Sequence, residues 1–114
     1  MSTKLDERTR REIPPEALSH YEVILDNATT RITFHRIRPG EQSGWHQHAD
    51  DYVGYHMATS DLSVEFGDGR KDKMISKEGV ATFYEVGDGF EHNVTNVSDC
   101  DMIALEIEYK RPAE

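Results

Sequence analysis

Two histidines separated by a single residue, His46 and His48, are the side chains in this sequence best suited to chemistry. On an extended strand, side chains two residues apart point to the same face, so these two imidazoles lie close together. That is the minimum geometry for chelating a transition metal. A third histidine, His92, stands later in the chain in the run Glu91-His92-Asn93. The residue types therefore indicate a metal site, provided that the fold brings the two segments together.

The elements that must position these histidines are short β-strands. Runs rich in Val, Ile, Tyr, Phe and Thr alternate with turn residues such as Pro39-Gly40 and Gly67-Asp68-Gly69. In the last run Ile103, Leu105 and Ile107 alternate with polar or small residues, which predicts one buried and one wetter face. Strands at this spacing predict a single all-β domain, a sandwich or small barrel. The expected strands span 20–25, 30–37, 51–58, 62–66, 73–76, 80–86, 92–97 and 102–110.

Composition excludes several classes of protein. The net charge of −9 argues against nucleic acid and anionic membranes as partners, because both bind basic faces. No stretch approaches the roughly 20 apolar residues of a membrane-spanning helix. The single cysteine, Cys100, closes no internal disulfide, so we expect a reducing, cytoplasmic location.

The first part of the chain differs from the rest. Charged residues crowd residues 1–18, and Pro14-Pro15 is expected to block a helix there. We therefore divide the chain into an exposed charged N-terminal arm, 1–18, and a barrel domain, 19–111. Because uncovered sheet edges favour pairing, we expect a homodimer.

The spacing around the histidines resembles the cupin superfamily. Gly40, His46 and His48 are in register with the first cupin motif, and His92 and Asn96 with the second. The resemblance implies an antiparallel jelly-roll β-barrel with a metal ion in its mouth. The runs HQHADDYVGYHMATSDL and FEHNVTNVSDCDMIALEIEYK further resemble small single-domain cupins associated with β-alanine degradation.

The carboxylate ligand of the first motif is missing from its usual place. The cupin glutamate should fall near Tyr52 or Val53. Asp50 and Asp51 stand just before, and a bulge could turn one of them toward the metal. Strand alternation favours Asp50, whereas the closer resemblance singles out Asp51. We expect His46, His48, His92 and Asp51 as ligands, with Tyr52 or Asp50 as the alternative to Asp51.

A barrel of this kind would hold its substrate beside the metal. We expect Tyr52, His56, His35 and Trp45 to line that pocket. The cofactor would be a divalent transition metal, Zn, Fe, Mn or Ni. Three functions remain open: a metal-dependent enzyme acting on a small organic acid or amine in catabolism, an iron-dependent dioxygenase, and a non-enzymatic small-ligand binder or sensor.

Overall fold

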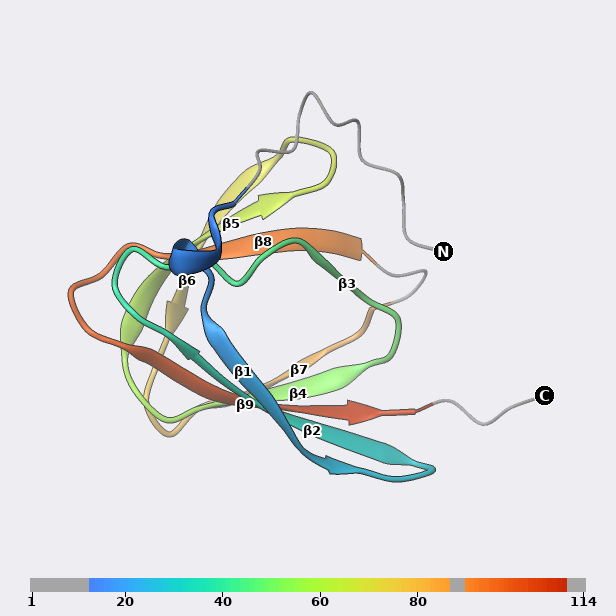
Figure 1. Cartoon of the computed structure of the whole chain (residues 1–114). Coiled ribbons are helices and arrows are strands. Elements are labelled where there is room, and N and C mark those ends of the chain that lie inside the picture. The colour runs from blue at the N-terminus through green and yellow to red at the C-terminus, as the bar shows by residue number, and fades with distance from the viewer. Residues whose placement is uncertain (1–12, 87–89, 111–114) are drawn as a thin grey trace.

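The chain folds into two antiparallel β-sheets that face one another (Figure 1). The computed structural model describes residues 13–86 and 90–110. Its described part contains one short 3-10 helix, η1, and nine strands. The elements are η1 (Pro15–Ala17), β1 (His20–Asp26), β2 (Thr30–Ile37), β3 (His46–His48), β4 (Tyr52–His56), β5 (Ser60–Phe66), β6 (Lys71–Ser76), β7 (Ala81–Tyr84), β8 (Phe90–Asn96) and β9 (Met102–Tyr109).

The larger sheet has the strand order β1-β2-β9-β4-β7, and the smaller sheet the order β3-β8-β5-β6. Apolar side chains from both sheets meet between them in a core of Ile37, Leu62, Met102 and Ala104. Strands β5 and β8 pair in the small sheet, and β2, β9 and β4 in the large one. The prediction of a single all-β antiparallel barrel is confirmed.

Two sequence expectations about strands need correction. His46–His48 forms a strand of its own, β3, which pairs with β8 and is too short to show as a β-rich run. On β9 the buried face is the opposite of the expected one, because Met102, Ala104 and Glu106 line the interior. Strand alternation then directs Ile103, Leu105 and Ile107 to the outer face. The interior holds both the apolar core and a polar site, so Met102 and Ala104 pack in the core and Glu106 faces the histidines.

The start of the described chain is attached to the barrel. Pro15 begins η1, because proline is tolerated at the first helical position, so the expected block to any helix is wrong. Beyond η1, the Ser19 amide donates to the carbonyl of Gln42, and the Gln42 amide donates to Ala17. Residues 1–12 of the expected arm, and residues 87–89 and 111 of the expected domain, lie outside the described residues. In the described part no helix has the length and apolarity needed to cross a membrane.

Candidate metal centre

Strand pairing brings the three histidines together. His46 on β3 lies directly opposite His92 on β8, and His48 lies two residues further on the same face of β3. The Nε2–Nε2 distances are 3.1 Å for His46–His48, 3.1 Å for His48–His92 and 2.9 Å for His46–His92. The predicted convergence of these side chains is thus present in the structure.

The backbone fixes the orientation of the His46 ring. His46 Nδ1 lies 2.8 Å from the carbonyl oxygen of Gly44, which can only accept, so Nδ1 carries the proton and donates. Gly44 has a φ of +90°, a conformation that favours glycine, and its amide donates to Asn93 Oδ1 at 2.9 Å. The Nε2 atom of His46 is left as a lone-pair donor facing the other two rings.

Hydrogen bonds alone cannot satisfy the triangle of Nε2 atoms. Each neutral nitrogen is either a donor or an acceptor, so among three mutually contacting nitrogens at least two are of the same kind. One of the three contacts therefore always sets donor against donor or acceptor against acceptor. A cation between them removes this conflict, because all three nitrogens then donate lone pairs. The donor set fits a metal ion.

Burial keeps these imidazoles neutral and ready to bind. Burial lowers the pKa of His48 to about 4, and His48 itself is only 3% exposed. Burial is the main cause that lowers the pKa of His92 to about 3, and electrostatic repulsion from His46 and His48 lowers it further. Burial also lowers the pKa of His46. At neutral pH no proton competes with a metal ion for these nitrogens.

The size of the nitrogen triangle is compatible with one shared ion. The three Nε2 atoms lie 2.9–3.1 Å apart, so an ion at about 2.1 Å from each of them would contact all three.

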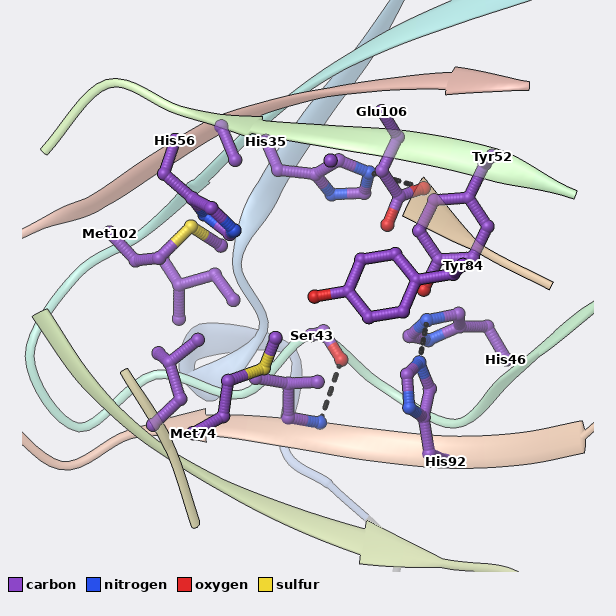
Figure 2. A pocket seen from close by; sticks show the side chains of 15 residues that line it. His35, Ser43, His46, Tyr52, His56, Met74, Tyr84, His92, Met102 and Glu106 are labelled. Carbon is purple, nitrogen blue, oxygen red and sulfur yellow. Dashed lines mark hydrogen bonds and ion pairs between the residues drawn. The ribbon is translucent and has the colours of Figure 1, made fainter. Parts of the chain in front are cut away.

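The histidines stand at one end of a largely apolar cavity of about 70 Å³ between the sheets. His46 and His92 lie at this end, and His56 and Met102 lie at the opposite end (Figure 2). The Nδ1 atom of His56 is 2.7 Å from the hydroxyl of Ser76, which is fully buried. The cavity thus has the candidate metal-binding histidines at one end and His56 at the other, within a largely apolar lining.

Glu106 is the residue that our sequence analysis missed. Its side chain lines the cavity from β9, with Oε1 3.3 Å from His35 Nε2 and Oε2 4.0 Å from His48 Nε2 (Figure 2). Burial favours the neutral acid, but the contact with His35 and the neighbouring His48 and His46 outweigh it and lower the pKa of Glu106 to about 2. The signal in the sequence was alternation on the last strand, which places Glu106 on the same face as Ala104.

The structure does not bring Asp51 to the histidines. Its Oδ1 accepts a hydrogen bond from the amide of Val86 at 2.9 Å, so it holds the segment after β7. Neither Asp50 nor Asp51 belongs to the converging set. The geometry therefore does not support the expected ligand role of Asp51, because its carboxylate is directed to the backbone.

Tyr52, one of the two positions near which the cupin glutamate was expected, packs against aromatic rings. Its ring stacks on His48, with centroids 4.4 Å apart, and on Tyr84, with centroids 4.8 Å apart. Burial raises the pKa of the Tyr52 phenol, so it stays protonated and is a poor ligand. Of the expected pocket residues, His35, Tyr52 and His56 line the cavity, whereas Trp45 is half-buried and does not.

Comparison with known proteins identifies the family. No family model matches the chain. The chain is 34% identical over 88 residues to the β-alanine degradation protein BauB of Pseudomonas aeruginosa, covering 77% of this chain and 90% of that protein. The crystal structure of a cupin domain from Bordetella pertussis Tohama I is 35% identical, with a TM-score of 0.75, and the match covers 82% of this chain and 95% of that one. A cupin 2 conserved barrel protein from Salinispora arenicola has a TM-score of 0.59 at 18% identity, covering 96% and 89%. The chain belongs to the cupin superfamily.

Proposed function

We propose that this cupin is a metal-dependent enzyme that acts on a small organic acid or amine in catabolism related to β-alanine degradation. The observation that carries the proposal is the triangle of Nε2 atoms of His46, His48 and His92, which lies at the cavity between the two sheets. The similarity to the β-alanine degradation protein of Pseudomonas aeruginosa supports the metabolic context.

The protein's own residues suggest a division of roles along the cavity. His46, His48 and His92 would hold the ion, which when bound would act as a Lewis acid toward an oxygen-bearing ligand. Leu62, Met74 and other apolar side chains in the middle exclude water. At the far end His56 presents its second nitrogen beside Gly54, where an added Cβ would lie 3.9 Å from that atom. The size of the cavity favours a short molecule.

Turnover by the metal-loaded protein tests this proposal. Short organic acids and amines would be incubated with the wild type and with His92→Ala, each after addition of zinc, iron, manganese or nickel. We expect turnover by one wild-type metal form and none by His92→Ala. A well-folded, metal-loaded wild type that binds such compounds without turning them over would instead support a binder or sensor.

An iron-dependent dioxygenase is the second candidate. Its support is the donor set of three histidines with no carboxylate among them, which would leave positions on a bound iron ion open for dioxygen and substrate. Oxygen uptake by the iron-loaded protein in the presence of substrate would support this candidate. Turnover without oxygen uptake would contradict it.

We also propose that the chain forms a homodimer through the outer face of the larger sheet. One apolar residue from each of the five strands lies in a continuous row across this face. Leu25 and Phe83, at the two ends of the row, are 42% and 55% exposed. An uncharged row of this length favours a second copy of the same face as its cover. The row is Leu25, Ile32, Ile107, Val53 and Phe83.

Light scattering after gel filtration tests the dimer. We expect twice the chain mass for the wild type and a single-chain mass for Ile107→Glu, which places a charge in the middle of the row. Ser63→Glu on β5 of the smaller sheet is the control. A wild type of single-chain mass would contradict the dimer.

We further propose a cytoplasmic location. Its support is Cys100, the one cysteine of the chain, which is a free, exposed thiol. Cell fractionation followed by detection of the native protein tests this proposal, and recovery from an oxidising compartment would contradict it.

A further inference from the structure

Among the described residues, the carboxylate that comes within ion-pair distance of the three histidines belongs to the last strand of the barrel. Glu106 lies on β9 opposite Gly54 on β4, in the register of the larger sheet. Glu106 Oε2 is 4.0 Å from His48 Nε2, beside the nitrogen triangle rather than within it.

His35, which is outside the histidine triangle, contacts the Glu106 carboxylate. His35 Nε2 lies 3.3 Å from Oε1 of the carboxylate, and this buried nitrogen makes no other polar contact among the described residues. Strand β2, which carries His35, pairs directly with β9. The carboxylate is thus fixed between His35 on one side and the histidine triangle on the other.

A carboxylate at this position would balance the charge of a bound metal ion. Three neutral imidazoles leave the full charge of a divalent cation uncompensated in a largely apolar cavity, and a buried unpaired charge is costly. Among the described residues that line the cavity, Glu106 is the acidic one. Tyr52, at the position of the usual cupin glutamate, stacks on His48 and supplies no charge.

We propose that Glu106 provides the negative charge of the metal centre, supplied from β9 in place of the missing carboxylate after His-x-His. It acts beside the ion, by balancing its charge and accepting a hydrogen bond from a molecule bound to it, and His35 positions it. The inference rests on the proposed three-histidine metal site; in it Glu106 acts on the ion electrostatically, and His35 is the positioning residue.

Metal affinity of the chelator-treated protein tests the inference. Zn²⁺ and Co²⁺ would be titrated into the wild type, Glu106→Gln and Glu108→Gln in competition with a chromogenic chelator. Loss of an outer carboxylate partner typically weakens binding about 10–100-fold, and we expect this for Glu106→Gln. Glu108→Gln is the matched control, because Glu108 lies two residues away on β9 and contacts Arg31 rather than the cavity. It should bind as the wild type does.

Two further variants separate a charge effect from a structural one. Glu106→Asp keeps the charge and should recover most of the affinity, and it is also the variant to use if Glu106→Gln does not fold. His35→Gln should shift the visible spectrum of bound Co²⁺ and weaken binding less than Glu106→Gln. Wild-type affinity in Glu106→Gln, with metal lost in His92→Ala, would overturn the role of Glu106 and leave the histidine site standing. Absence of binding in the wild type would overturn both.

Discussion

The aromatic ring of Tyr52 lies flat against the imidazole of His48, with their centroids 4.4 Å apart and their planes inclined by 19°. The tyrosine therefore supports the metal-site histidine with its ring face rather than with its hydroxyl. In the sequence the same tyrosine stands where a cupin carboxylate is expected. The stack explains how this position contributes to the site without donating a ligand atom.

Replacing Tyr52 with phenylalanine is expected to leave metal binding intact. The ring that packs on His48 and Tyr84 is retained, and the lost phenol is protonated and unsuited to ligation. Tyr52→Ala, which removes the stack, should weaken binding because His48 loses its support. Competition titration with Zn²⁺ distinguishes the two variants. Loss of metal from Tyr52→Phe would show that the phenol oxygen is a ligand.

Asp51→Ala is expected to affect stability more than metal affinity. The variant leaves the Val86 amide without its acceptor, and an unmade, partly buried hydrogen bond costs about 1–3 kcal/mol. Urea denaturation of the metal-free protein would measure this loss. Asp51→Asn, which keeps an acceptor oxygen, should be milder. If Asp51→Ala instead abolished metal binding with unchanged stability, Asp51 would be the ligand that the sequence suggested.

Asn93 is expected to influence the metal without touching it. Its Oδ1 accepts from the Gly44 amide, and the Gly44 carbonyl in turn orients His46. Asn93→Ala should therefore weaken Zn²⁺ binding, within the range of about 10–100-fold seen for outer partners. Asn93→Asp retains the acceptor and should bind more tightly than Asn93→Ala. Equal affinities for the two variants and the wild type would contradict this coupling.

The sequence revealed the strands and the His46–His48 pair because both depend on local patterns, whereas the convergence of His92 with this pair was expected from the resemblance to the cupin motifs. β-rich runs separated by turns define strands, and the spacing of His46 and His48 places both on one face. The carboxylate could not be found in this way, because Glu106 reaches the site only through the pairing of β9 with β4. The prediction of which face of β9 is buried was wrong for a related reason. Apolar Ile107 lies on the outer face of β9 because residues of the site occupy the inner face. Alternation shows that the two faces differ, but it does not determine which of them faces the interior.

The metal-free protein is expected to lose stability as the pH falls below about 6.5. His48 and His92 have folded pKa values of about 4 and about 3, below the ordinary 6.5 that they regain on unfolding. The unfolded state therefore binds more protons below pH 6.5, and each such proton changes stability by about 1.4 kcal/mol per pH unit. The stabilising effect of Glu106, with a pKa of about 2 against 4.5, persists above pH 4.5 and is lost below it.

Urea denaturation at pH 7.5 and pH 5.0 measures this dependence. The difference between the two pH values should be smaller in His48→Gln, which lacks one of the two imidazoles. A wild type equally stable at both pH values would contradict the neutral, buried state of these histidines.

The metal content of the purified protein tests the central claim most directly. The protein would be prepared without chelator and without a nickel affinity column, and elemental analysis would be compared between the wild type and His48→Ala. We predict one transition metal ion per chain in the wild type and a content near zero in a folded His48→Ala. A wild type without transition metal, which also takes up none of zinc, iron, manganese or nickel when they are supplied, would contradict a metal centre at His46, His48 and His92.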